Sequence, residues 1–286
     1  LHFGTQTMVS ASHANPSNPE FVQALEIARS VQAAKGHALF VGGWVRDRLA
    51  GWKSKDIDVE VYGVTAEHLR SLLEKIDRVD LVGESFTVYK VGKVDVSLPR
   101  RESKTGRGHR GFKIEGDPNL SFKEAARRRD FTINGLYYNA DDNKVTDLVD
   151  GLTDLKNKVI RLIGEPTARY REDPVRMLRA MRFAAKLDFT FEPATGDPIR
   201  ELGHLLQDVP AARLFEEFLK LFMSGQALST HTLMEQYDIF QWLFPGSRNH
   251  KEPERSTRLT ELALQSTDRR ISEDLPVTPA FIIAAI

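Results

Sequence analysis

Apolar positions along the first half of the chain follow two different periods. In residues 21–36 they recur every three or four positions, which predicts a helix that ends at Gly36. Residues 38–41 form a short apolar run, and residues 56–62 alternate strictly between polar and apolar side chains, so both are predicted strands. The chain is therefore expected to begin with a mixed α/β region.

Two more strands are predicted for residues 86–91 and 94–98, which form a hairpin around Gly92 and Lys93. Residues 99–113, which follow, are basic, contain several glycines and have no apolar period. Such a charged run is usually a solvated surface segment. This one is predicted to be a mobile loop at the edge of the α/β region.

From about residue 150 the strand pattern ends, and helical periods appear in residues 172–186, 213–223 and 230–243. The expected fold class is α+β. The expected segments are a disordered leader (1–20), a mixed α/β head (21–150), a helical neck (151–205) and a helical body (206–286). The sequence has no initial Met and stops within an apolar run, so we expect a fragment whose C-terminal elements are missing.

Composition limits the chemistry without identifying it. The 286 residues include 40 basic and 40 acidic side chains and no cysteine. With no net charge, any surface that binds nucleic acid must be local. Without cysteine, a metal ion is left to carboxylates and histidine, and a reducing cytoplasm is the expected location. No run reaches the roughly 18 apolar residues of a membrane span, so no membrane partner is expected.

Three acids crowd one face of the strand predicted for residues 56–62. Because side chains alternate, Asp56, Asp58 and Glu60 point to one side and the apolar residues to the other. A protein keeps like charges together most readily where a divalent cation neutralises them, as Mg²⁺ does together with substrate phosphates. Asp95, in the second strand of the hairpin, is a candidate to complete such a site. The alternative is a solvated edge strand whose acids face water.

A glycine pair precedes this strand. The apolar run 39–41 leads into Gly42 and Gly43, and residues 44–49 have helical spacing. Glycines at a turn from strand to helix let backbone N–H groups approach a phosphate, so the turn is a candidate triphosphate cradle beside the metal site. The alternative is a tight turn that needs a positive φ.

These segments carry a family resemblance. Residues 39–47, followed by Asp56 and Asp58, resemble the nucleotidyltransferase signature of the DNA polymerase beta superfamily, in the form used by bacterial CCA-adding enzymes and poly(A) polymerases. The resemblance implies a DNA polymerase beta-like head, followed by an all-helical neck and body, that adds nucleotides to RNA 3′ ends. It also implies two Mg²⁺ ions held by Asp56, Asp58 and Asp95, and ATP as substrate, with CTP as a further candidate.

Later segments resemble the family's other motifs in the same order. Residues 127–134 resemble the motif associated with ribose recognition, residues 147–151 the hinge region, and residues 172–176 the amino-acid template that pairs with the incoming base. Residues 99–113 correspond to the family's flexible loop, which favours contact with nucleotide or primer. The candidate nucleotide-binding residues are Gly42, Gly43, Arg46, Asp47, Arg129, Asp130, Asn134, Glu172, Asp173, Arg176, Arg179 and Arg182, the last two as candidates to reach phosphates or RNA.

The residues alone leave simpler explanations open for two of these motifs. Residues 127–129 offer guanidinium groups for phosphates and Asn134 an amide for a ribose hydroxyl, but the same segment fits a basic turn before a buried strand. Glu172 and Arg176 are four positions apart and would equally form a salt bridge on a helix face.

Different parts of the chain resemble different members of the family. Residues 83–90 and 95–102 resemble CCA-adding enzymes, with Glu84 and Ser85 where a poly(A) polymerase would carry basic residues. The segments that resemble bacterial poly(A) polymerase are 159–164, 169–174 and 210–217. The part that would hold the RNA is the helical part, and it resembles poly(A) polymerase over the longer and closer stretch. We therefore expect an ATP-using enzyme that adds A residues to mRNA or other RNA. The alternatives are a CCA-adding tRNA nucleotidyltransferase that uses CTP and ATP, and a catalytically inactive RNA-binding module.

Overall fold

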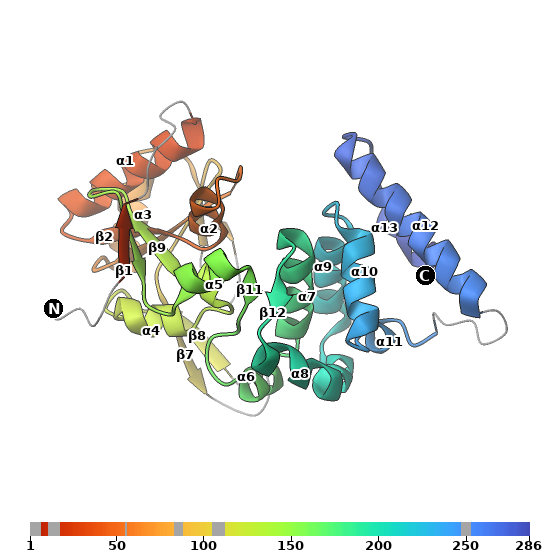
Figure 1. The fold of residues 1–286 in the computed structure, drawn as a ribbon. Coiled ribbons are helices and arrows are strands. Elements are labelled where there is room, and N and C mark those ends of the chain that lie inside the picture. Colours follow the sequence, from red (N-terminus) through yellow and green to blue (C-terminus); the bar gives the residue numbers. More distant parts are fainter. Residues whose placement is uncertain (1–6, 11–17, 55, 83–87, 105–111, 247–252) are drawn as a thin grey trace. The chain divides into compact units, whose positions relative to one another are not determined.

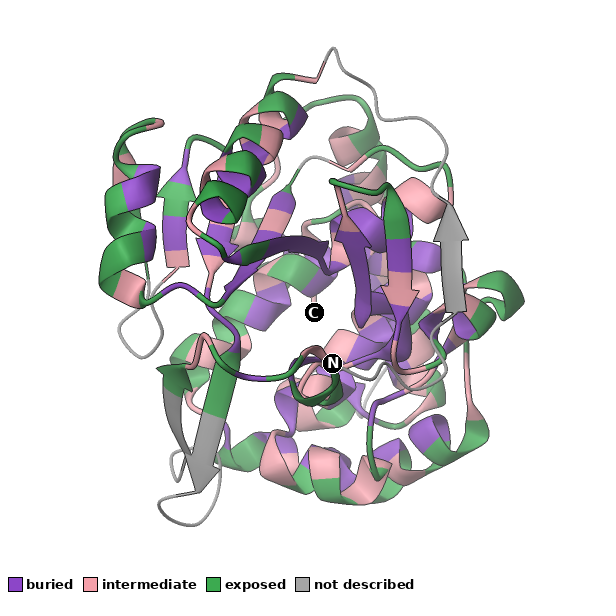
Figure 2. Ribbon diagram, turned by 90° about the vertical axis from the view of Figure 1, so that its left-hand side faces the viewer, coloured by how far each residue is buried: buried purple, intermediate pink, exposed green. Residues whose placement is uncertain are grey.

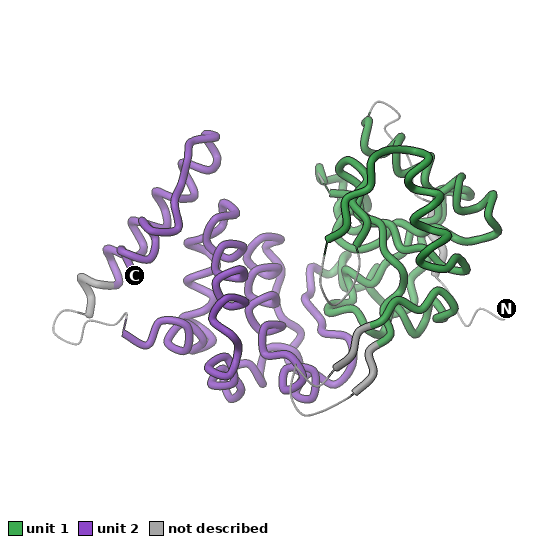
Figure 3. The backbone as a smooth tube through the Cα atoms, turned by 180° about the vertical axis from the view of Figure 1, so that it is seen from behind, with its two compact units in different colours: residues 1–157 green, residues 158–286 purple. Residues whose placement is uncertain are grey.

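The computed structural model describes residues 7–10, 18–54, 56–82, 88–104, 112–246 and 253–286 (Figure 1). Its helices carry buried residues on one side and exposed residues on the other (Figure 2). The chain divides into two compact units, Leu1–Asn157 and Lys158–Ile286 (Figure 3). Among the described residues, none of the helices combines the length and the apolar character needed to traverse a lipid bilayer.

The first unit is built on an eight-stranded mixed sheet with the order β1-β10-β9-β2-β3-β6-β5-β4. Strands β3 and β6 pair in parallel, and the other neighbours in this sheet pair antiparallel. The strands are β1 (Thr7–Ser10), β2 (His37–Val41), β3 (Ile57–Tyr62), β4 (Val79–Val82), β5 (Val88–Val91), β6 (Val94–Ser97), β9 (Leu136–Asn139) and β10 (Lys144–Asp147). The helices are α1 (Pro19–Ala33), α2 (Gly43–Leu49), α3 (Ala66–Leu73), α4 (Phe122–Arg127), α5 (Gly151–Asn157) and the 3₁₀ turn η2 (Thr132–Asn134).

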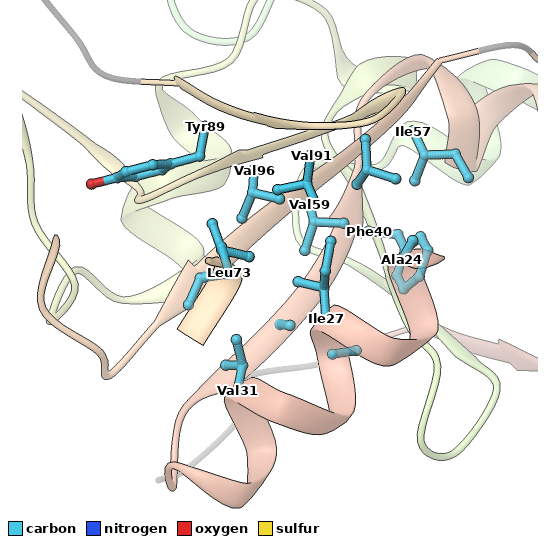
Figure 4. Packing of buried hydrophobic residues seen from close by; sticks show 14 of the residues in the cluster. Ala24, Ile27, Val31, Phe40, Ile57, Val59, Leu73, Tyr89, Val91 and Val96 are labelled. Carbon is cyan, nitrogen blue, oxygen red and sulfur yellow. The ribbon is translucent and has the colours of Figure 1, made fainter. Parts of the chain in front are cut away.

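The alternation of side chains along β3 divides the sheet into an apolar face and a face that carries acids. Ile57, Val59 and Val61 are buried in the core that includes α1 and α3. Figure 4 shows the apolar side chains of α1 pointing toward Val59 and its neighbours on the sheet. Asp58 and Glu60 therefore lie on the opposite face, on which α4 packs through a second buried cluster. The predicted strand pattern is confirmed.

The hairpin predicted around Gly92 is also confirmed. Val91 of β5 pairs with Val94 of β6, and Gly92 has a φ of 59°. Residues 83–87, and with them the predicted Glu84 and Ser85 distinction, lie outside the described residues. The exposed edge strand β4 was not predicted, because its alternation is too short and too polar to distinguish it from a loop.

Two segments predicted to be irregular contain strands. In the leader, Thr7–Ser10 forms β1 by antiparallel pairing with β10, so the prediction of disorder is wrong for these residues. The basic segment forms the two-stranded sheet of β7 (Arg100–Lys104) and β8 (Phe112–Gly116), so the loop prediction is wrong for its two ends. Backbone hydrogen bonds between strands define β1 and the sheet of β7 and β8. These bonds do not require the apolar period on which the sequence prediction depended. Residues 105–111 lie outside the described part of the chain.

The first helix ends as predicted near Gly36, but for another reason. The residue with a positive φ, 62°, is Lys35. Gly36 is required instead by packing, since a Cβ there would clash with the Val64 side chain and lie 2.9 Å from the Tyr62 carbonyl oxygen.

The boundary between the units falls after Asn157 rather than at the predicted residue 150. Helix α5 belongs to the first unit because two side-chain interactions fix it there. The Asp147 carboxylate accepts hydrogen bonds from the N–H groups of Val149, Gly151 and Leu152 at the start of α5. Thr132 donates to Asp154 at 2.6 Å. The segment predicted to be a hinge is thus fastened to the head on its N-terminal side.

The second unit is helical and holds both the predicted neck and the predicted body. Its helices are α6 (Pro166–Glu172), α7 (Val175–Leu187), α8 (Pro193–Leu202), η3 (Gly203–Asp208), α9 (Ala211–Phe222), α10 (Ala227–Gln236), α11 (Phe240–Leu243), α12 (Pro253–Ser272) and α13 (Pro279–Ala285). A short parallel pair, β11 (Val159–Ile160) with β12 (Thr190–Phe191), joins two of its loops.

The prediction of one continuous helix over residues 172–186 is wrong, because two helices meet there. Helix α6 ends at Glu172, Asp173 is extended with φ −147° and ψ 96°, and α7 begins after Pro174. The cause is the proline, which disfavours the helical conformation in the residue before it. Likewise, the helix predicted for 230–243 is divided at Asp238, whose φ is 56°.

Candidate active site

Asp58 and Asp95 lie side by side on neighbouring strands. In the parallel pairing of β3 with β6, Asp58 is the register partner of Asp95, so both carboxylates project from the same face of the sheet. Burial, and after it the negative charge of Asp95, raise the pKa of Asp58 from its usual 3.8 to about 6. A positive charge placed between these two carboxylates would remove the repulsion.

The glycine turn adjoins the same carboxylate. Gly42 follows β2, whose last residue, Val41, pairs with Asp58. It has a φ of 71°, and a Cβ at this position would lie 3.2 Å from Asp58 Oδ2. Both the conformation and the close approach favour glycine here. The predicted cradle and the predicted metal site are therefore adjacent in the first unit.

The expected set of three metal ligands is only partly assembled. Asp56 is exposed just before β3 and contributes weakly to the raised pKa of Asp58. The described residues include no group of three or more His, Asp or Glu side chains close enough to share a metal ion. Mg²⁺ is commonly bound by one or two carboxylates together with water and substrate phosphates. The pair Asp58 and Asp95, whose repulsion nearby positive charges oppose only in part, fits a cation that arrives with its substrate.

Glu60 shares the face of Asp58, but a cation does not have access to its carboxylate. Glu60 is 8% exposed, accepts a hydrogen bond from Arg129 Nη2 at 2.9 Å, and accepts another from the Tyr62 hydroxyl. The Arg129 guanidinium also lies 5.3 Å from the centre of the Tyr137 ring. Arg129, predicted to contact substrate, is thus part of a buried network next to Asp58, whose raised pKa its positive charge partly opposes.

A second network braces the glycine turn. Arg46 is 2% exposed and donates through Nε and Nη2 to Asp47 Oδ1, at 2.8 and 2.5 Å. Its Nη1 donates to Asn134 Oδ1 at 2.7 Å, and Asn134 Nδ2 donates to Asp130 Oδ1 at 3.3 Å. The structure brings together four predicted nucleotide-binding residues, whose polar groups bind one another. These bonds tie α2 to η2, and contact with nucleotide stays a prediction.

In the second unit, the predicted base-reading residues lie at the junction of α6 and α7. Arg176 Nη1 donates to the Arg169 carbonyl oxygen at 2.8 Å and to Glu172 Oε2 at 3.3 Å. Arg169 Nη1 donates to the same Glu172 oxygen at 3.1 Å. The predicted salt bridge between Glu172 and Arg176 is confirmed, although the two residues belong to different helices.

Asp173 is held from a third helix. Its Oδ2 accepts a hydrogen bond from Arg213 Nη2 of α9 at 2.7 Å, and its Oδ1 accepts one from the Val175 N–H at 3.3 Å. Both carboxylate oxygens of Asp173 therefore have a fixed direction. This contact fastens the junction of α6 and α7 to the body.

Arg179 and Arg182 lie further along α7, around Phe183. Their guanidinium groups are 5.6 and 4.6 Å from the centre of the Phe183 ring. Arg182 Nε is also 3.9 Å from Glu217 Oε2 of α9. The structure therefore places these two arginines on the same helix as Arg176.

Two residues of these sites were not predicted. Lys90 Nζ lies 3.2 Å from Asp95 Oδ1, and the predicted hairpin already contained the signal, because a turn at Gly92 sets Lys90 opposite Asp95. Arg213, by contrast, is 40 residues from Asp173, and no local pattern in the sequence indicates that contact.

Comparison with known proteins connects both units to one group of enzymes. A family model described as "Poly A polymerase head domain" matches residues 38–161, and one described as "Probable RNA and SrmB- binding site of polymerase A" matches residues 188–250. Poly(A) polymerase I of Escherichia coli O6:H1 is 43% identical over 281 residues, which are 92% of this chain and 59% of that protein. The CCA-adding enzyme of Ligilactobacillus salivarius is 37% identical over 207 residues, 71% of this chain and 50% of that protein.

The fold has solved counterparts in the same group. The crystal structure of the Bacillus stearothermophilus CCA-adding enzyme in complex with CTP matches with a TM-score of 0.67 and 25% identity, over 88% of this chain and 58% of that one. The chain spans about 60% of the length of the curated poly(A) polymerases that it matches.

Replacing Asp58 by Asn should stabilise the metal-free protein at neutral pH. Because the folded state has the higher pKa, it binds the proton more tightly than the unfolded chain, so stability falls as pH rises from about 4 to about 6. Asp58→Asn removes this cost, and its free energy of unfolding at about pH 7.5 should exceed that of the wild type by on the order of 2 kcal/mol. Below about pH 4 the difference should vanish, because Asp58 is then protonated in both states.

Urea denaturation with a chelator present measures this difference at both pH values. Asp80→Asn, which changes an acid on the exposed strand β4, is the control and should show no comparable gain. If Asp58→Asn is no more stable than the wild type at neutral pH, the carboxylate pair is not strained by repulsion and burial.

Proposed function

Because the chain belongs to the family of bacterial poly(A) polymerases and CCA-adding enzymes, we propose that it carries the catalytic part of an RNA 3′-end nucleotidyltransferase. The proposed reaction is template-independent addition of A residues from ATP to RNA, in the cytoplasm. The observation that supports it most directly is the pairing of Asp58 with Asp95 next to the Gly42 turn. A triphosphate and a divalent cation need such a combination of carboxylates and a turn without side chains.

In the proposed reaction, the 3′-hydroxyl oxygen of the RNA bonds to the α-phosphorus of ATP. The bond from that phosphorus to the pyrophosphate oxygen breaks, pyrophosphate leaves, and the hydroxyl proton passes to water. Asp58 and Asp95 would hold the divalent cations, with Asp56 reaching them from the start of β3. Bound Mg²⁺ supplies charge neutralisation at the phosphates and acidifies the 3′-hydroxyl. The chain contributes mainly by positioning, since no nucleophilic side chain is required.

Residues at the two networks have separate roles in this proposal. Gly42 and Gly43 give the triphosphate access to backbone N–H groups, and the bonds from Arg46 to Asp47 and Asn134 keep that turn in place. Arg129 sets the charge next to Asp58. A buried ion pair such as Arg129 with Glu60 costs about 3–5 kcal/mol to break by removing one partner, so this part of the site is rigid.

Base choice is assigned to Asp173 and Arg176, with Glu172 orienting Arg176. Because Asp173 is held by Arg213, and Arg176 by Glu172 and Arg169, their donors and acceptors have fixed directions. Donors and acceptors with fixed directions suit an enzyme that adds one kind of nucleotide. CCA addition, by contrast, requires a site that accepts C and then A. The similarity to poly(A) polymerase I over 92% of the chain favours the same choice.

CCA addition is the second candidate, since the CCA-adding enzyme with bound CTP has the same fold at 25% identity. An inactive RNA-binding module is disfavoured, because Asp58 and Asp95 are both present and paired.

The length and composition of the product distinguish the two enzymatic candidates. With Mg²⁺ and ATP alone, the protein should extend a generic single-stranded RNA by many A residues, and CTP should add little. Labelled RNA resolved on a denaturing gel measures both. Efficient incorporation of CTP on a tRNA that lacks its 3′ end, with no tail on other RNA, would contradict A addition and favour CCA addition.

Removing Arg213 should loosen base choice without removing catalysis, because Asp173 then loses the bond that fixes its direction. We expect Arg213→Ala to lower the ratio of kcat/KM for ATP to that for CTP by roughly tenfold, which is about 1.4 kcal/mol. Arg176→Ala should have the same kind of effect. Single-turnover rates with each nucleoside triphosphate measure the ratio.

The exposed Arg269 on α12 provides the control, and Arg269→Ala should leave the ratio unchanged. Equal loss of rate for all four nucleotides in Arg213→Ala or Arg176→Ala would assign these arginines a structural role only.

A further inference from the structure

The second unit contains a basic cavity that the proposed reaction does not use. It has a volume of about 570 Å³ and opens between α7, α9 and the start of α13. Three cationic side chains, Arg182, Lys186 and Lys220, line it together with the hydroxyl of Ser224. Its remaining walls are mainly apolar and include Leu219 and Met223.

A buried carboxylate organises two of these cations. Glu217 is 4% exposed, and its Oε1 accepts a hydrogen bond from Lys220 Nζ at 2.9 Å. Its Oε2 lies 3.9 Å from Arg182 Nε, and the Arg182 guanidinium packs against the Phe183 ring. One acid among three cations leaves a net charge of about +2, and Glu217 holds Lys220 and Arg182 in place. An anion that enters loses little side-chain entropy in binding to such preorganised groups.

The cavity continues a basic row along α7. Arg176, Arg179, Arg182 and Lys186 follow one another at intervals of three, three and four residues, which places them on one side of a helix. From residue 176 to residue 186 the helix rises about 15 Å, a distance that a few nucleotides of a single strand span. A strand whose 3′ end lies near the base-reading residue Arg176 would reach the cavity with its upstream phosphates.

We propose that this cavity binds backbone phosphates of the RNA strand, a few nucleotides upstream of the 3′ end. The proposal rests on the proposed function and adds a site to it. Lys and Arg bind phosphates without regard to sequence, a serine hydroxyl donates to phosphate oxygens, and an apolar wall accepts a ribose or base. Such a site would keep the RNA bound between successive additions without restricting its sequence.

The test compares two variants that each lower the net charge by two. One is the double variant Lys186→Gln with Lys220→Gln, and the other is Arg269→Glu on the exposed part of α12. The dissociation constant of a fluorescent oligoadenylate is measured by anisotropy at several salt concentrations. Thermal unfolding shows whether each variant is folded, and Lys186→Glu, a change at an exposed position, replaces the double variant if that one is not.

We expect the double variant to bind RNA roughly tenfold more weakly, with a salt dependence reduced by about 1.4 in log–log slope, because each single-strand phosphate contact contributes about 0.7. Lys186→Glu alone should reduce the slope by about 0.7. Arg269→Glu should retain the wild-type slope.

An unchanged slope in a folded cavity variant would overturn the phosphate site while leaving the proposed function intact, provided that the wild type binds RNA. An equal loss in Arg269→Glu would show that only net charge matters and would also overturn the site. A raised KM for ATP with unchanged RNA binding would assign the cavity to the triphosphate instead. If the wild type itself does not bind RNA, the proposed function fails, and the site fails with it.

Discussion

The repulsion between Asp58 and Asp95 is the constraint on which the head depends. Two carboxylates in register on adjacent parallel strands cannot both carry charge without cost. Burial, and after it the negative charge of Asp95, raise the pKa of Asp58 to about 6. The fold opposes this repulsion with Arg129 on one side and Lys90 on the other. The Gly42 turn passes so close to Asp58 that a side chain there would approach its carboxylate. A divalent cation with substrate phosphates would relieve the remaining repulsion.

The rest of the first unit keeps this strained pair in place. Apolar residues on the far side of β3 anchor the strand in the core beneath α1 and α3. On the acid-bearing side, Glu60 binds Arg129 and Tyr62, so the strand is also fixed by polar contacts close to Asp58. The bonds of Arg46 with Asp47 and Asn134 do the same for the glycine turn. Buried polar networks, as well as the hydrophobic core, therefore hold strand β3 and the glycine turn in position.

Local patterns predicted the parts of the molecule that depend on neighbours in sequence. The alternation from Asp56 to Tyr62 correctly separated the acid-bearing face from the core, and the turn at Gly92 set the register of β5 and β6. The division of the helix at Pro174 had a visible signal, which the apolar period concealed. The strand β1 could not be predicted in this way, because backbone pairing with the distant strand β10 creates it. The strand β7 pairs with the nearby β8, but the basic segment that contains them has no apolar period to indicate either strand. The bond from Arg213 to Asp173 likewise depends on the packing of α9, which no window of sequence contains.

The central claim is that Asp58 and Asp95 bind a divalent cation together with a nucleoside triphosphate. Mn²⁺ is a suitable probe, because electron paramagnetic resonance measures its free concentration without any turnover. With a non-hydrolysable ATP analogue present, the wild type should bind Mn²⁺ much more tightly than Asp58→Asn or Asp95→Asn, while the control Asp80→Asn should match the wild type. Equal Mn²⁺ binding by the wild type and the two site variants would contradict the account.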